Sequence, residues 1–169
     1  QSLEIGQKPI PLARELELVG MYLSIQRLRF GDKLTYSLPR HEDAEGIVVL
    51  PMLLQPVVEN AIVHGIESKL GEGTIDLVIV REWDQVTIVV VDSGVGMERR
   101  KLEEIEASLN APDEADEYRI GLRNVHQRIK LAYGGEYGLQ IQSCLGVGTN
   151  VSIRLPLKEG ESSVQAIDH

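Results

Sequence analysis

Apolar residues recur every three or four positions along four stretches of this 169-residue chain, which is the spacing of a helix that buries one face. The predicted helices cover residues 11–30, 51–67, 97–109 and 120–133. Pro11 suits the first turn of the first helix, and Gly31-Asp32 ends that helix. Pro56 falls inside the second, so that helix either starts there or kinks there.

Runs rich in β-branched residues predict strands at 74–80 and 86–91. A short strand is predicted at 33–38, and a final pair at 139–144 and 149–155 around the glycine turn. Residues 83–85 are a hairpin candidate. Residues 110–117 are acidic, contain a proline and lack apolar anchors, which predicts a mobile loop, and a polar tail follows residue 157. Strand pairs mixed with long helices predict the α+β class: a two-layer α/β sandwich whose mixed, mostly antiparallel sheet carries helices on one face.

Composition narrows the ligands that the chain can bind. Seventeen basic residues against 26 acidic residues give a net charge of −9, which argues against a general nucleic-acid surface. A nucleotide remains possible, because backbone amides and a metal can balance phosphate charge. No apolar run approaches the roughly 20 residues that a membrane span needs. The single cysteine, Cys144, excludes an internal disulfide and a cysteine-based zinc cluster.

Three polar residues, Glu59, Asn60 and His64, interrupt the apolar pattern of the second predicted helix. Asn60 and His64 are four positions apart and therefore share a face. An amide oxygen is a hard ligand suited to Mg²⁺, which keeps waters and takes phosphate oxygens at its other positions. A helix end with polar residues turned to water has the same pattern, so this segment alone leaves both interpretations open.

A strand of β-branched residues ends in a carboxylate and two glycines, within the segment Asp92-Ser93-Gly94-Val95-Gly96-Met97. A buried acceptor at the end of a strand can take a hydrogen bond from the exocyclic amine of adenine, where guanine presents an oxygen. The glycines let the backbone approach a ligand closely. Alone, this pattern fits any strand followed by a loop.

Two more glycine motifs follow. Gly121 lies where a helix begins, so that exposed N–H groups can meet phosphates, and Arg123 and Arg128 add positive charge. The segment Gly146-Val147-Gly148-Thr149 joins the last two strands. Each is ordinary by itself, as a loop-to-helix junction and a hairpin turn. The four motifs are informative because they occur together, in this order, separated by strand-like runs.

In this order the motifs resemble the GHKL (Bergerat-fold) ATP-binding family and, more narrowly, the catalytic domain of sensor histidine kinases of the LytS/YesM-like type. The resemblance covers roughly residues 9–156 and is strongest in 55–65, 120–128 and 11–30. It implies the Bergerat fold. It also implies that residues 1–30 end a dimerisation and phosphoacceptor region, 31–157 form the ATP-binding domain, and 158–169 are the polar tail.

The resemblance implies that Asn60 holds Mg²⁺, that Asp92 reads adenine, and that the glycines line the phosphate side. Residues 97–119 correspond to a lid over ATP. The implied catalytic residues are Glu59 and Asn60. The residues expected to bind nucleotide are Asn60, His64, Gly65, Asp92, Gly94, Gly96, Met97, Arg119, Gly121, Leu122, Gly148 and Thr149.

Two positions depart from the family pattern. Hydrolysing relatives carry a catalytic glutamate one helical turn before the Mg²⁺ asparagine, where this chain has Pro56. Proline cannot act as a base, so phosphoryl transfer to a separate acceptor is favoured over hydrolysis. Glu59 either orients the acceptor imidazole or is a solvated helix carboxylate. Arg119 stands where the subfamily usually has glycine, and either contacts a phosphate or crowds the loop.

None of the four histidines (His41, His64, His126 and His169) matches the family's acceptor, which the resemblance places upstream. The implied function is a Mg²⁺·ATP-binding catalytic domain of a two-component sensor histidine kinase that phosphorylates an upstream histidine. The expected protein is a homodimer with a response regulator as partner and no nucleic-acid partner. It is expected to be the cytoplasmic part of a bacterial sensor, anchored in the membrane only through segments absent here.

Three alternatives stay open. The first is a non-catalytic or degenerate GHKL interaction module, which Arg119 favours. The second is a GHKL ATPase of the chaperone or topoisomerase type, which Pro56 and the small size disfavour. The third is a serine-phosphorylating anti-sigma factor, which the segment 11–30 disfavours by resemblance.

Overall fold

The computed structural model describes residues 8–111 and 117–157, of which 117–119 are described by their backbone only. The helices are α2 (Leu12–Phe30), α3 (Leu54–Asn60), α4 (Arg99–Leu109) and α5 (Glu117–Tyr133), with short helical turns η1 (Gly31–Lys33), η2 (His41–Ala44) and η3 (Ala61–Ile66). The strands are β1 (Ile10–Pro11), β2 (Leu34–Ser37), β3 (Val48–Val49), β4 (Gly73–Arg81), β5 (Gln85–Asp92), β6 (Gly138–Cys144) and β7 (Gly148–Pro156). No helix in the described ranges is long and apolar enough to cross a membrane.

Five strands form the main sheet in the order β2-β4-β5-β7-β6, and β1 and β3 make a separate two-stranded ladder. All neighbours in the main sheet are antiparallel except β2 and β4, which run parallel from the pair Leu34 and Gly73. The central strand β5 ends at Asp92, directly opposite Thr149 of β7. The second and fourth glycine motifs therefore meet at one end of the sheet.

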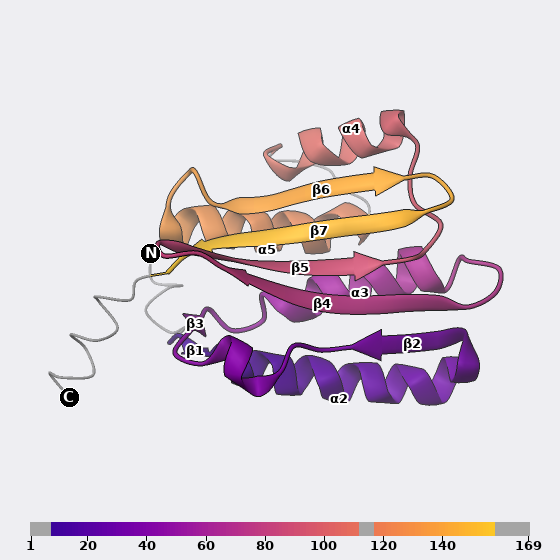
Figure 1. Cartoon of the computed structure of the whole chain (residues 1–169). Helices are drawn as coiled ribbons and strands as arrows, with labels where there is room; N and C mark the ends of the chain where they lie inside the picture. The colour runs from indigo at the N-terminus through magenta and orange to yellow at the C-terminus, as the bar shows by residue number, and fades with distance from the viewer. Residues whose placement is uncertain (1–7, 112–116, 158–169) are drawn as a thin grey trace, which may run out of the picture.

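The helices cover one face of the sheet, as predicted. Along β5, Val86, Ile88 and Val90 are buried, whereas the alternate residues on the other face remain partly exposed. Helices α3 and α5 lie behind the sheet, and α2 lies beside β2 at its edge (Figure 1). The two-layer sandwich with a mixed, mostly antiparallel sheet is therefore confirmed.

Helix α2 contributes to the same core as the helices behind the sheet. Its fully buried side chains are Leu12, Val19 and Leu23, and Leu16 is nearly so. The prediction that residues 1–30 end a dimerisation region remains a prediction, and residues 1–7 lie outside the described part of the chain. Within that part, α2 packs as an integral element of the sandwich.

The segment predicted as one helix over 51–67 has two parts. Helix α3 begins at Leu54, so Pro56 stands in its first turn, where a missing N–H breaks no helical hydrogen bond. At Ala61 the helix widens into a π-helical turn that ends with the Glu67 N–H bonded to the Ile62 carbonyl at 2.8 Å. Such turns are rare and often stand at functional sites.

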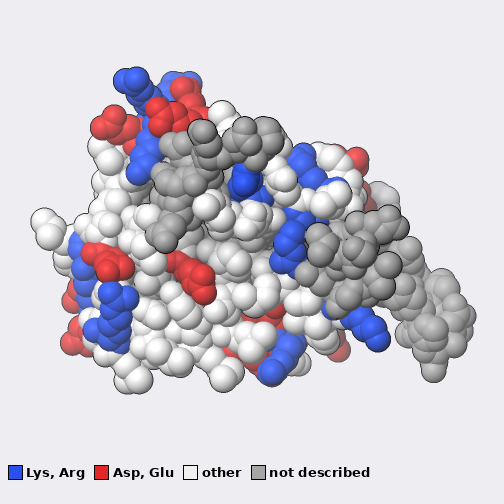
Figure 2. All heavy atoms as spheres, turned by 180° about the vertical axis from the view of Figure 1, so that it is seen from behind, with Lys and Arg blue, Asp and Glu red and all other residues white. Residues whose placement is uncertain are grey.

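The boundaries around α4 and α5 differ modestly from those predicted. Helix α4 begins at Arg99, and α5 begins three residues before the predicted Ile120. Of the predicted loop 110–117, residues 112–116 lie outside the described residues, as does the tail 158–169. Acidic and basic groups are interspersed over the face in Figure 2. Ion pairs Arg99–Glu103 and Arg100–Glu104 lie along α4.

Candidate functional site

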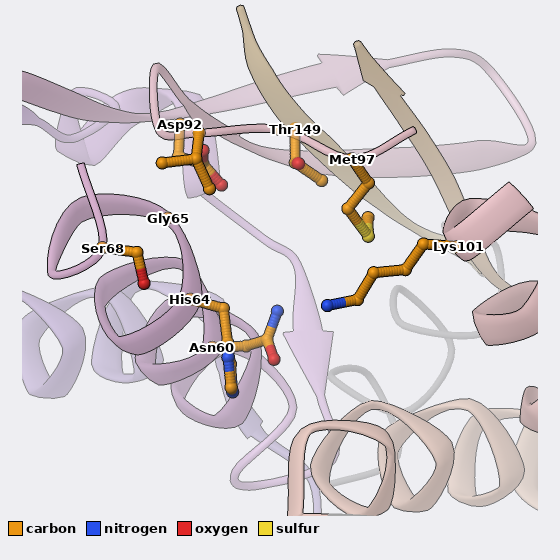
Figure 3. A pocket seen from close by; sticks show the side chains of 10 residues that line it. Asn60, His64, Gly65, Ser68, Asp92, Met97, Lys101 and Thr149 are labelled. Carbon is orange, nitrogen blue, oxygen red and sulfur yellow. The ribbon is translucent and has the colours of Figure 1, made fainter. Parts of the chain in front are cut away.

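One pocket lies between the α3–η3 helix, the end of the sheet and α4 (Figure 3). The helix contributes one wall, the strand end and its following loop a second, and α4 a third. Seven of the predicted nucleotide-binding residues meet here. The full lining is Asn60, His64, Gly65, Ser68, Asp92, Val95, Gly96, Met97, Lys101 and Thr149.

The helical wall carries polar side chains at a four-residue spacing. Asn60 is the last residue of α3, His64 lies in the π-helical turn, and Ser68 continues the row beyond it. Lys101 extends from α4 across the cavity toward Asn60 (Figure 3). An amide and an ammonium group therefore face each other at this end of the pocket, where an anionic group with a bound cation can be held between them.

Asp92 forms the opposite end of the pocket and is only 7% exposed. Its Oδ1 accepts a hydrogen bond of 2.8 Å from the Gly94 N–H. Burial raises the pKa of Asp92, while the backbone amides of Gly94 and Thr149 and the charge of Lys69 oppose the rise. A desolvated carboxylate of this kind is a strong acceptor for a ligand N–H that reaches it.

Glycines around Asp92 allow backbone segments to touch. A Cβ on Gly65 would lie 2.9 Å from Asp92 Oδ1, and a Cβ on Gly94 would overlap the backbone of Gly65. The helix can therefore press directly against the strand end only because both positions lack side chains. This close approach brings the Asp92 carboxylate to the helical wall of the same pocket.

The glycine turn at 146–149 packs against the loop that follows Asp92. Gly96 and Gly148 have φ values of +70° and +144°, and a Cβ at either would overlap a backbone carbonyl, that of Cys144 or of Asp92. The Ser143 hydroxyl accepts the Met97 N–H at 2.9 Å and lies 2.7 Å from the Thr149 hydroxyl. The loop after Asp92 is thus held in place by the β6–β7 hairpin.

Several predicted residues do not line this pocket. Glu59 accepts a hydrogen bond of 3.1 Å from Gln55 on the same helix. Leu122 is buried in the core, a Cβ on Gly121 would meet open space, and the Arg119 side chain lies outside the described part. Gly94 and Gly148 do not line the pocket either, although a Cβ on Gly148 would overlap the Asp92 carbonyl.

The arginines of the third motif have structural partners. Arg123 donates to the Ala111 carbonyl at 2.7 Å, close to the end of α4. Arg128 donates to the carbonyls of Pro51 and Met52 at 2.7 and 3.2 Å. These contacts hold neighbouring segments of backbone, and the expectation that the two arginines add positive charge for a phosphate stays a prediction.

His126 is also structural. It is buried, and burial lowers its pKa, so the ring is neutral near pH 7. Its Nδ1 accepts the Leu139 N–H at 3.0 Å, and its Nε2 then donates to the Asn110 side-chain oxygen at 3.0 Å. His126 thus ties α5 to β6 and to the end of α4.

Three residues line the pocket without having been predicted from the sequence: Ser68, Val95 and Lys101. The spacing of Asn60 and His64 extends to Ser68, so a search along that helical face could have found it. Lys101 has no such local signal, because its place opposite Asn60 depends on how α4 packs. Among the side chains that the structure describes, those of residues 8–111 and 120–157, no three His, Cys, Asp or Glu gather as a metal site.

A family profile described as "Histidine kinase-, DNA gyrase B-, and HSP90-like ATPase" matches residues 49–159. The chain is 32% identical over 163 residues to the sensor protein kinase HptS of Staphylococcus aureus strains RF122 and USA300. That match takes in 96% of the chain but spans only about a third, 31%, of the length of those relatives.

Solved structures share the fold. The histidine kinase domain of a blue-light activated kinase from Erythrobacter litoralis EL346 superposes with a TM-score of 0.57 at 21% identity, covering 93% of this chain and 65% of that one. A nucleotide-free catalytic domain of histidine kinase ThkA gives 0.64 at 14% identity, covering 89% and 97%. The narrower LytS/YesM-like assignment remains a prediction.

Proposed function

The chain belongs to the family of histidine kinase-, DNA gyrase B- and HSP90-like ATPases, and on this basis we propose that it is the Mg²⁺·ATP-binding catalytic domain of a two-component sensor histidine kinase. The domain donates the γ-phosphoryl group of ATP to a histidine on an upstream region. The full-length protein is a homodimer, and a response regulator receives the phosphoryl group. The similarity to proteins named sensor protein kinase supports this assignment.

The observation that carries the proposal is the buried Asp92 carboxylate at one end of the pocket. Adenine presents an exocyclic amine, which donates to this acceptor, whereas guanine presents an oxygen at the same position. Gly65 leaves space beside the carboxylate, since a side chain there would press on it. The base therefore lies against Asp92, with the phosphates directed toward Asn60.

The phosphate end has the groups that a metal-bound triphosphate needs. The Asn60 amide oxygen is a suitable ligand for Mg²⁺, whose other positions are filled by phosphate oxygens and water. Lys101 faces Asn60 from α4 and offers a positive charge to the same phosphates. The bound Mg²⁺ supplies charge neutralisation, and the protein's own groups orient the phosphate chain.

Transfer is favoured over hydrolysis because the position of a general base is occupied by Pro56, in the first turn of α3. In the transfer step a nitrogen of the acceptor imidazole attacks the γ-phosphorus, and ADP leaves. Glu59, bonded to Gln55 at 3.1 Å, lies one residue before Asn60 and orients the incoming imidazole. The transfer depends mainly on positioning and charge stabilisation.

The proposal extends to the setting of the whole protein. The sensor is bacterial and anchored in the membrane through segments outside this chain, with the present domain on the cytoplasmic side. The HptS relatives, whose matched part is 31% of their length, are long enough to hold such further segments. The part of the lid segment 97–119 that the structure describes includes α4, which carries Lys101 to the pocket, and residues 112–116 of that segment lie outside the described residues.

Calorimetry with Mg²⁺·ATP tests the binding claim. Asn60→Ala is expected to remove the dependence of ATP affinity on Mg²⁺ while leaving the protein folded. A steady-state phosphate-release assay on the isolated domain tests the Pro56 argument and is expected to show slow turnover. Rapid phosphate release would assign the chain to the hydrolysing ATPases instead, and unchanged Mg²⁺ dependence in Asn60→Ala would remove Asn60 from the site.

A further inference from the structure

The turn that leads into α3 has an unfavourable backbone conformation. Met52 has a φ of +64°, in the left-handed region that residues with a Cβ seldom adopt. Its side chain is 46% exposed, so packing of that side chain does little to enforce the conformation. Other contacts must therefore hold this turn, and they come from two helices that are distant in sequence.

Helix α2 holds the turn through Glu15, a carboxylate that is only 1% exposed. Glu15 accepts the Met52 N–H at 2.8 Å and the Leu54 N–H at 3.3 Å. Leu54 is the first residue of α3, and no side chain of the α3 segment caps that end. A negative charge bonded to the first N–H groups of a helix is the arrangement that stabilises a helix start.

Helix α5 holds the opposite side of the same turn. Arg128 donates to the Pro51 carbonyl at 2.7 Å and to the Met52 carbonyl at 3.2 Å. The N–H groups of the turn thus point to α2, and its carbonyls point to α5.

This clamp, defined as Glu15 and Arg128 acting on Pro51–Leu54, determines where α3 begins. Asn60 follows Leu54 by six residues, which is about 9 Å along a helix. Because α3 is short and continuous, a shift or tilt at Leu54 moves the Asn60 end of the pocket relative to Asp92. A displacement of about 1 Å between a metal-bound phosphate and the groups that hold it has a large effect at such sites.

We propose that Glu15 and Arg128 are positioning residues of the nucleotide site, which fix the start of α3 and thereby the distance between the Asn60 and Asp92 ends of the pocket. The inference rests on the proposed binding of Mg²⁺·ATP in this pocket. It makes nucleotide affinity depend on how α2 and α5 are each seated against the turn before α3, although neither Glu15 nor Arg128 lines the pocket.

The test uses Glu15→Gln. The glutamine oxygen can still accept one of the two backbone N–H groups, but its NH₂ group faces the other, donor against donor. We expect Mg²⁺·ATP affinity to fall roughly fivefold, within the range typical of coupling from residues outside a ligand site. Arg128→Lys, which loses the two-pronged contact, is expected to act in the same direction. Glu17→Gln, an exposed carboxylate on the same helix, is the control and is expected to bind like wild type.

Rescue separates positioning from general structural support. Met52→Gly removes the backbone strain, so the turn needs less enforcement, and Glu15→Gln/Met52→Gly is expected to recover affinity to within about twofold of wild type. All affinities are measured by calorimetry at a temperature where circular dichroism shows each variant to be folded. If Glu15→Gln does not fold, Arg128→Lys with and without Met52→Gly provides the same comparison.

The outcomes distinguish the two proposals. Wild-type protein that binds Mg²⁺·ATP, with Glu15→Gln and Arg128→Lys binding equally well, overturns the positioning role alone. Loss of affinity without recovery by Met52→Gly also overturns it, because the strained turn would then not be the point of action. Wild-type protein that binds no Mg²⁺·ATP refutes the proposed function itself.

Discussion

Replacement of Asp92 by asparagine probes the base end of the pocket with almost no change in shape. Oδ1 of Asp92 is already engaged by the Gly94 N–H, so the asparagine oxygen is expected to take over that bond. The amide NH₂ then occupies the other carboxylate position and faces the adenine amine, donor against donor. The variant therefore loses an acceptor and gains a repulsive contact at the same place.

The expected loss follows from the burial of this group. A hydrogen bond to a charged, buried partner contributes about 1.5–3 kcal/mol, and each 1.4 kcal/mol corresponds to about tenfold in affinity. Asp92→Asn should therefore weaken Mg²⁺·ATP binding roughly 10- to 100-fold, measured by calorimetry. Asp84→Asn, an exposed position in the β4–β5 turn, makes the same change of charge and should leave affinity unchanged.

Asp92→Asn should weaken ATP binding but increase the stability of the fold at neutral pH relative to wild type. The pKa of Asp92 is raised in the folded state, so its contribution to stability is fully present below the ordinary aspartate pKa and is lost as pH rises through the raised value. As pH rises from acidic to neutral, the free energy of unfolding of wild type, measured by urea titration, should therefore fall relative to that of Asp92→Asn. ATP affinity within twofold of wild type in Asp92→Asn would refute the assignment of Asp92 to base recognition.

Three further changes test the phosphate end, the loop after Asp92 and the core. Lys101→Gln should weaken Mg²⁺·ATP binding by about 0.5–1 kcal/mol, as for exposed charge pairs, and calorimetry should show a larger effect at low salt and none with adenosine. Gly96→Ala should lower the free energy of unfolding by about 3 kcal/mol or more, because its Cβ would overlap the Cys144 carbonyl at a φ of +70°; a thermal melt within 2 °C of wild type would contradict this. Leu23→Ala, at a fully buried site on α2, should cost about 2–5 kcal/mol in urea unfolding, whereas a much smaller loss would show that α2 is not part of the cooperative core.

Much of the fold was predictable because its signals are local. Strand-like runs bounded by turn residues located all five strands of the main sheet, and helical periodicity located the helices to within a few residues. The face shared by Asn60 and His64 was likewise a matter of spacing along one helix. In each case the neighbours that decide the structure lie close together in sequence.

The missed features depend on contacts between distant segments. Lys101 reaches the pocket because of where α4 packs, and the apolar pattern of 61–66 does not distinguish a π-helical turn from an α-helix. Glu15 did leave a trace in the sequence, as a carboxylate on the buried side of an apolar helix, but its partners lie 37 and 39 residues away. The left-handed Met52 had no signal, since methionine does not favour that conformation.

The parallel ladder between β2 and β4 has a consequence for how the domain can be shortened. The family profile begins at residue 49, downstream of both α2 and β2. A fragment cut to that boundary would leave β4, nine residues long and bearing half-exposed Val78 and Val80, as a bare sheet edge. Such an edge pairs readily with other chains, so the trimmed fragment should aggregate, and the smallest soluble unit should start before Leu12.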